Sequence, residues 1–145
     1  MPKKHTILVV DDEETDRAII VEALRAEKYN VVEAETYKEA LAVCDANPGI
    51  SFLVADVALP DGNGCALATT IRQRYPRLRV LFVSGHVGSE ACRYYGLDVA
   101  DLHFLRKPFE PADLVQRVKQ VMKSDVPFPS LYVPKSWSSS GSRAT

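Results

Sequence analysis

Five polar side chains stand directly after short apolar runs of the sequence, and their types suit metal and phosphate chemistry. They are Asp11, Asp12, Asp56, Ser84 and Lys107. Each apolar run has the length and composition of a buried strand. In an open parallel sheet, ligands bind outside the carboxyl ends of the strands, at the point where the strand order reverses. We therefore expect these five side chains to gather at one edge of a sheet.

The three carboxylates would share one small volume if the first and third strands were neighbours, because adjacent strands lie roughly 4.8 Å apart. Like charges about 4 Å apart repel by about 1 kcal/mol in water and about 4 kcal/mol at an effective dielectric near 20. Lys107 would offset only part of this repulsion. The arrangement therefore favours a hard divalent cation, Mg²⁺ first and Mn²⁺ as its alternative. A carboxylate neutralised in this way can attack phosphorus and form an acyl phosphate.

The elements that must position these residues are strands and helices in strict alternation. Strands are predicted at Thr6–Val10, Asn30–Ala34, Phe52–Ala55, Val80–Val83 and His103–Arg106. Helices are predicted at about Thr15–Lys28, from a cap at Thr36 to Asn47, and at about Cys65–Tyr75, Gly88–Tyr95 and Pro111–Lys123. Between Asp56 and the third helix, the residues Pro60, Gly62 and Gly64 predict a loop. Because parallel neighbours need crossovers of one hand, the alternation predicts an α/β fold with helices on both faces of the sheet.

Composition sets the broad class of the protein. With 145 residues, 46% of them hydrophobic, the chain has enough material for one buried core and too little for two. Its net charge of -1 gives no indication of binding to nucleic acid or to an anionic membrane. No apolar run approaches the roughly 20 residues that span a bilayer, so we expect a cytoplasmic protein. The cysteines Cys44, Cys65 and Cys92 form no CxxC pair, which disfavours both a zinc site and a disulfide framework.

The composition changes after Ser124. The remaining residues are rich in proline and serine and show little hydrophobic periodicity. We therefore expect one domain over residues 1–124 and a flexible tail over residues 125–145, too short to be an output domain.

Four segments in order, LVVDDE, ADVALPDGNG, VLFVSGH and FLRKPF, make the sequence resemble the receiver domain of two-component response regulators. The resemblance covers about Thr6 to Lys123. It implies a flavodoxin-like, doubly wound, five-stranded parallel sheet with the strand order 2-1-3-4-5. It also implies a signalling protein that catalyses only its own phosphorylation and dephosphorylation, and so is not an enzyme in the ordinary sense.

By this resemblance Asp56 takes a phosphoryl group from a sensor histidine kinase or a histidine-phosphotransfer protein. Asp12 would bind Mg²⁺ directly and Asp11 through water, and the backbone carbonyl of Ala58 would complete the protein ligands. The phosphoryl group would then switch the face formed by the fourth and fifth strand–helix units, to which a downstream partner of unknown identity would bind.

The resemblance also assigns roles to the last two strand ends. Ser84 would donate a hydrogen bond to one phosphoryl oxygen, and Lys107 would pair with another after pairing with Asp56 in the resting state. Phe104 matches an aromatic residue that turns inward on activation, although a plain core role is an equally open interpretation. The peptide bond between Lys107 and Pro108 matches one that receivers hold cis.

The same residues bear on other functions. A flavodoxin-type electron carrier needs a phosphate-binding loop after the first strand, where this chain has acids from Asp11 to Glu14. A phosphatase of the haloacid dehalogenase type expects a second aspartate two residues after the nucleophile, where this chain has Ala58. Asp11 and Asp12 could also be simple helix N-terminal acids. A non-phosphorylated pseudo-receiver that serves only as a docking module remains the open alternative.

Overall fold

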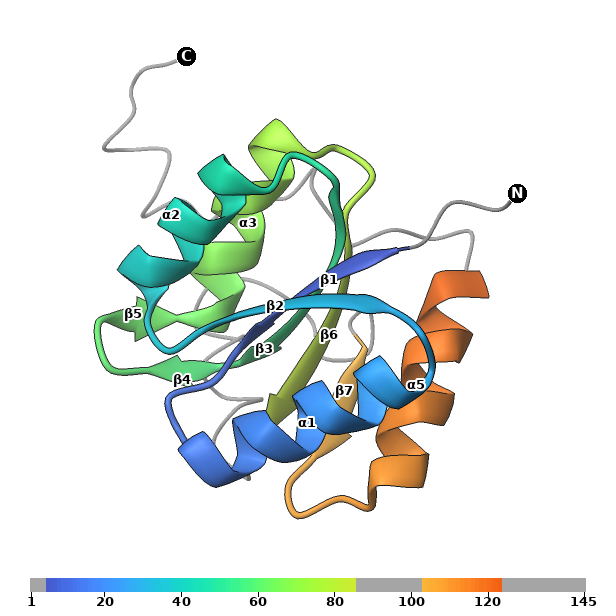
Figure 1. Cartoon of the computed structure of the whole chain (residues 1–145). Coiled ribbons are helices and arrows are strands. Elements are labelled where there is room, and N and C mark those ends of the chain that lie inside the picture. Colours follow the sequence, from blue (N-terminus) through green and yellow to red (C-terminus); the bar gives the residue numbers. More distant parts are fainter. Residues whose placement is uncertain (1–4, 86–102, 124–145) are drawn as a thin grey trace.

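A parallel sheet forms the centre of the computed structural model, which describes residues 5–85 and 103–123 (Figure 1). In this part of the chain the sheet has five strands in the order β2-β1-β3-β6-β7. The strands are β1 (Thr6–Val10), β2 (Asn30–Ala34), β3 (Ile50–Asp56), β6 (Arg79–Ser84) and β7 (Phe104–Arg106). Counted along the chain as sheet strands, this is the predicted order 2-1-3-4-5, and the α/β fold is confirmed.

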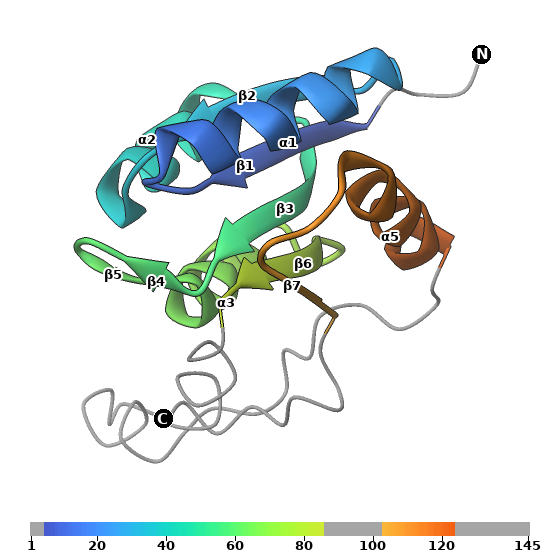
Figure 2. The ribbon, with the colours of Figure 1, turned by 90° about the horizontal axis from the view of Figure 1, so that it is seen from below.

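Helices cover both faces of the sheet (Figures 1 and 2). Within the described ranges they are α1 (Glu14–Ala26), α2 (Tyr37–Ala46), α3 (Gly64–Arg74) and α5 (Pro111–Lys123). Thr36 caps α2 as predicted, since its hydroxyl accepts a hydrogen bond from the Glu39 backbone N–H at 3.0 Å. The helix predicted at Gly88–Tyr95 lies outside the described residues, as do Cys92 and the tail.

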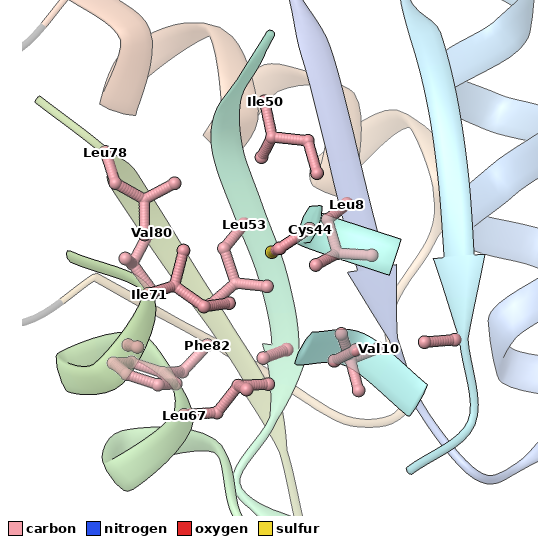
Figure 3. Packing of buried hydrophobic residues seen from close by; sticks show 14 of the residues in the cluster. Leu8, Val10, Cys44, Ile50, Leu53, Leu67, Ile71, Leu78, Val80 and Phe82 are labelled. Atoms are coloured by element: carbon pink, nitrogen blue, oxygen red, sulfur yellow. The ribbon is translucent and has the colours of Figure 1, made fainter. Parts of the chain in front are cut away.

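Alternation along the strands divides the apolar side chains between two cores, because successive strand residues point to opposite faces. Leu8, Leu53 and Phe82 pack in the core beneath α2 and α3. Figure 3 labels Ile71 and Leu67 from α3 beside these strand residues. On the opposite face, alternate residues of the same strands pack beneath α1 and α5. These are Ile7, Val9, Phe52 and Val54, with Ile20, Leu24, Leu114 and Val118 from the helices.

Two expectations from the sequence were wrong. Where a plain loop was predicted after Asp56, β4 (Ala58–Leu59) and β5 (Gly62–Asn63) form a short antiparallel ribbon. The cysteine spacing disfavours a disulfide framework, yet Cys65 is disulfide-bonded, whereas Cys44 is free and buried. Cysteine spacing along a sequence does not reveal which segments the fold brings together, and this is why the pattern misled.

Across residues 5–85 and 103–123, none of the helices has both the length and the apolar character required to cross a bilayer. The cytoplasmic location expected from the sequence stays a prediction.

Candidate functional site

Strand register brings the predicted residues to one end of the sheet. Val10 of β1 pairs with Ala55 of β3, so the next residues along, Asp11 and Asp56, stand side by side. On the other flank of β3, Asp56 pairs with Val83. Ser84 follows Val83 on β6 and pairs with Arg106 of β7, so Lys107 comes next at the same edge. The apolar strand sequences thus fix the positions of the polar residues that follow them.

Three carboxylates meet at this edge. Asp11, Asp12 and Asp56 each offer an oxygen, and the three oxygens lie within 4.8 Å of one another. Asp11 and Asp56 are buried, with 1% and 8% of their surface exposed, whereas Asp12 faces solvent. Hard divalent cations bind to oxygen ligands of this kind, and Mg²⁺ uses one or two carboxylates while it keeps water in its other positions. The donor set therefore fits a metal that enters from the solvent side.

Lys107 lies against the same cluster. Its ammonium nitrogen donates to Asp11 Oδ2 at 2.8 Å and to Asp56 Oδ2 at 2.9 Å. The Lys107 side chain is only 16% exposed. A lysine offers three donors on one compact charge, so it neutralises part of the cluster without filling the place of a metal.

Burial and neighbouring charges have opposite effects on the pKa values of this cluster. Burial raises the pKa of Asp11 above its ordinary value, although hydrogen bonds from Lys107 and from the Glu13 backbone N–H oppose that rise. For Lys107, burial lowers the pKa, but the hydrogen bonds to Asp11, Asp56 and Asp16 outweigh it, so the pKa is raised. Lys107 therefore stays charged, and the buried Asp11 carboxylate depends on cationic partners.

Backbone contacts fix the two buried carboxylates. Asp11 Oδ1 accepts from the Glu13 N–H at 2.9 Å, and Asp56 Oδ1 accepts from the Ala58 N–H at 3.0 Å. Each bond reaches two residues ahead and closes a turn over its own carboxylate, as aspartates do at turns. In both residues one oxygen is thus held by the backbone, while Oδ2 is bound by Lys107.

The other predicted residues lie close by. Ser84 is buried, and its backbone carbonyl accepts from the Lys107 N–H at 2.9 Å. Phe104 is half-buried against Phe82, with ring centroids 5.5 Å apart. The peptide bond between Lys107 and Pro108 is cis, as the resemblance implied. Ala58 begins β4 beside Asp56.

Two acidic residues are missing from the sequence interpretation, one at the site and one at the start of α2. Asp16 on α1 places Oδ2 3.0 Å from the Lys107 ammonium nitrogen. Asp61, in the turn between β4 and β5, accepts from the backbone N–H groups of Tyr37 and Lys38 at 2.7 and 3.0 Å, and so caps α2. Asp16 lies in the first turn of the helix that follows Asp11 and Asp12, and this closeness in sequence is the one signal that pointed to it. Nothing in the sequence indicated that Asp61 reaches α2.

Comparison with known proteins identifies the family. The family model described as response regulator receiver domain matches residues 7–119. Sensor kinase CckA of Brucella abortus is 34% identical over 119 residues, which are 81% of this chain and 12% of that protein. The transcriptional regulatory protein CpxR of Escherichia coli is 31% identical over 117 residues, which are 81% of this chain and 49% of that protein.

A solved structure agrees with these matches. The response regulator receiver domain protein (CheY-like) of Methanospirillum hungatei superimposes with a TM-score of 0.68 and 27% identity, over 81% of this chain and 93% of that one. This chain spans about half, or less, of the length of the two curated relatives above. Receiver domains accept phosphoryl groups from histidine kinases and are not conventional enzymes. The chain belongs to the response regulator receiver domain family of two-component signalling.

Proposed function

We propose that the protein is a Mg²⁺-dependent phosphoryl acceptor and that Asp56 is the residue that takes the phosphoryl group. The observation that carries this proposal is the placement of Lys107, whose ammonium group bonds both Asp11 and Asp56 at the edge of the three-carboxylate cluster. A structural ion pair would need only one carboxylate. Two buried carboxylates, a third exposed one and a single ammonium leave a net negative charge, which a divalent cation would neutralise.

The metal would be held by Asp12 directly, by Asp11 through water, and by Asp56 and the Ala58 carbonyl. When bound, Mg²⁺ supplies the positive charge that lets an anionic nucleophile approach an anionic phosphoryl group. Family membership and the oxygen donors of the cluster support this assignment.

In the proposed reaction a carboxylate oxygen of Asp56 forms a bond to phosphorus, and the bond from phosphorus to the donor breaks. With a phosphohistidine donor, the imidazole leaves and takes up a proton. Lys107 moves a hydrogen bond from Asp56 to a phosphoryl oxygen, and the Ser84 hydroxyl donates to another. Phosphoryl oxygens accept strong hydrogen bonds, and the added charge can bias a two-state equilibrium in the surrounding segments.

The donor in the cell would be a sensor histidine kinase or a histidine-phosphotransfer protein, and the output would be a downstream protein that binds the face around β7 and α5. We place the receiver domain at residues 1–124, with residues 125–145 as a tail.

The test is incubation with acetyl phosphate and Mg²⁺, followed by intact-mass measurement. We expect an adduct of about 80 Da that is absent without Mg²⁺ and absent in Asp56→Asn. No adduct in the unaltered protein would contradict the proposal and would leave the non-phosphorylated docking module as the better interpretation.

A further inference from the structure

Asp16 is a third carboxylate on Lys107. Its Oδ2 lies 3.0 Å from the ammonium nitrogen, beside the contacts with Asp11 at 2.8 Å and Asp56 at 2.9 Å. The ammonium group has three N–H donors. In the described part of the chain, Asp11 and Asp56 accept hydrogen bonds from it, and Asp16 forms a third ion pair with it.

The three partners of Lys107 have different roles in the proposed reaction. Asp11 belongs to the three-carboxylate cluster, and Asp56 both belongs to it and takes the phosphoryl group. Asp16 is outside that cluster. It is therefore the one partner of Lys107, among these three, whose charge and bonding need not change when the metal binds or when the acyl phosphate forms.

The start of α1 holds Asp16 in place relative to the cluster. Glu13 precedes the helix and makes no side-chain capping bond. Instead the Glu13 N–H donates to Asp11 Oδ1 at 2.9 Å, and the Arg17 guanidinium donates to the Asp11 backbone carbonyl at 2.8 Å. Asp16 lies in the first turn, where the helix dipole favours a carboxylate. The first turn of α1 is thus tied to Asp11, and Asp16 projects from a fixed position.

An ordinary surface ion pair would contribute little, because solvent screens the charges and ordering two side chains costs entropy. This pair is different in two respects. The Lys107 side chain is 16% exposed and that of Asp16 is 34% exposed, so both are partly withdrawn from water. The ammonium is also already ordered by two other carboxylates, so its contact with Asp16 requires little additional ordering.

From this geometry we propose that Asp16 is a positioning residue for Lys107. It keeps the ammonium group directed at the acceptor while one ammonium N–H transfers its hydrogen bond from Asp56 to the phosphoryl group. This inference rests on the proposed function. With acetyl phosphate, an Asp56 oxygen bonds to phosphorus, the bond from phosphorus to the acetate oxygen breaks, and acetate leaves with the electron pair. No proton is gained or lost. Lys107 exchanges its hydrogen bond to Asp56 for one to the phosphoryl group within this step, and its ion pair with Asp16 persists throughout.

The first test compares initial rates of adduct formation with acetyl phosphate, each at saturating Mg²⁺. Calorimetric titration of each variant gives its Mg²⁺ dissociation constant and hence the saturating concentration. Asp16→Asn should lower the rate by about threefold to tenfold, the range of one partly exposed charged contact. The matched control is Glu14→Gln, which removes one negative charge from the same helix turn and should leave the rate nearly unchanged. Asp16→Glu keeps the charge and should restore much of the rate.

A double-variant cycle shows whether Asp16 acts through Lys107. In a Lys107→Ala background, Asp16→Asn should cause no further fall in the rate, because the group that it positions is gone. Equal falls in the two backgrounds would overturn the inference, since Asp16 would then act independently of Lys107.

The second readout needs neither metal nor phosphoryl donor. The ¹H–¹⁵N signal of the Lys107 ammonium group should be visible in the metal-free protein and in Glu14→Gln. It should broaden by hydrogen exchange in Asp16→Asn, where one donor becomes open to water. An unchanged signal together with an unchanged rate overturns the inference and leaves the proposed function standing. Absence of any adduct in the unaltered protein overturns both.

Discussion

Gly64 offers a sharp test of how the fold fixes the acceptor. It is the first residue of α3, and its N–H donates to the Val57 carbonyl at 2.8 Å. A Cβ at this position would lie 2.4 Å from the Asp56 carbonyl oxygen, 3.1 Å from the Asp56 carbonyl carbon and 3.2 Å from Val57 Cα. All three are backbone atoms, so no side-chain rotation can relieve the overlap. The Gly64→Ala variant must therefore move α3 or the backbone of the acceptor.

The size of the effect follows from these contacts. Ordinary van der Waals contact begins at 3.4 Å, so the shortest contact requires a movement of 3.4 − 2.4 = 1.0 Å. Overpacking of this kind costs up to about 3 kcal/mol. Replacing glycine by alanine also stabilises by up to about 1 kcal/mol, because alanine loses less backbone freedom on folding. The net expectation is a loss of about 2 kcal/mol from the free energy of unfolding.

Urea unfolding followed by circular dichroism measures this difference. Gly49→Ala is the matched control, because the nearest atom to its added Cβ is Thr6 Oγ1 at 4.0 Å. The control should unfold within about 0.5 kcal/mol of the unaltered protein. Gly64→Ala should also phosphorylate much more slowly, because catalytic steps are sensitive to shifts of about 1 Å. If Gly64→Ala proves as stable and as reactive as Gly49→Ala, the close packing of α3 on the acceptor backbone is wrong.

Three further predictions follow from the same geometry. Mg²⁺ at about 100 times its dissociation constant should raise the free energy of unfolding by about 2.7 kcal/mol, and Asp12→Ala should abolish this gain. A melting temperature that does not change on titration with Mg²⁺ would count against the metal site. Hydrogen bonds from the Lys38 and Tyr37 backbone N–H groups lower the pKa of Asp61 below its ordinary 3.8, so its contribution to stability is present above pH 3.8 and is lost as the pH falls further. Asp61→Ala should therefore have a lower free energy of unfolding than the unaltered protein at pH 7, and the difference should narrow as the pH falls below 3.8. A difference that stays constant from pH 7 into acid would contradict the capping of α2 by Asp61. Burial raises the pKa of the Cys44 thiol to about 11, so Cys44 should resist iodoacetamide at pH 8 until urea unfolds the chain, and peptide mapping that finds rapid native labelling would refute its burial.

Much of the fold was predictable because its signals are local. The strand bounds Thr6–Val10 and Asn30–Ala34 match the prediction. The first is a continuous β-branched and apolar run that stops abruptly at Asp11. The helix Pro111–Lys123 was also predicted with its observed bounds, because proline suits a first turn and an apolar stripe follows. The third strand begins at Ile50, two residues earlier than predicted, because Ser51 in its second position interrupts the apolar run.

The site was predictable to the extent that it follows from parallel strands. Asp11, Asp56 and Lys107 come directly after, or at the end of, three strands, and register then brings them together. Asp16 and Asp61 could not be assigned in the same way. Their partners, the Lys107 ammonium and the N-terminus of α2, lie 91 and about 24 residues away in sequence, and only tertiary packing determines such contacts.

The central claim is that Asp56, and no other carboxylate of the cluster, carries the phosphoryl group. Hydride reduction converts an acyl phosphate of aspartate into homoserine, whereas it leaves a free carboxylate unchanged. After treatment with acetyl phosphate and Mg²⁺, peptide sequencing by mass spectrometry should find homoserine at position 56 and aspartate at positions 11, 12 and 16. Homoserine at any of those three positions, or at none of the four in a protein that carries the adduct, would contradict the account.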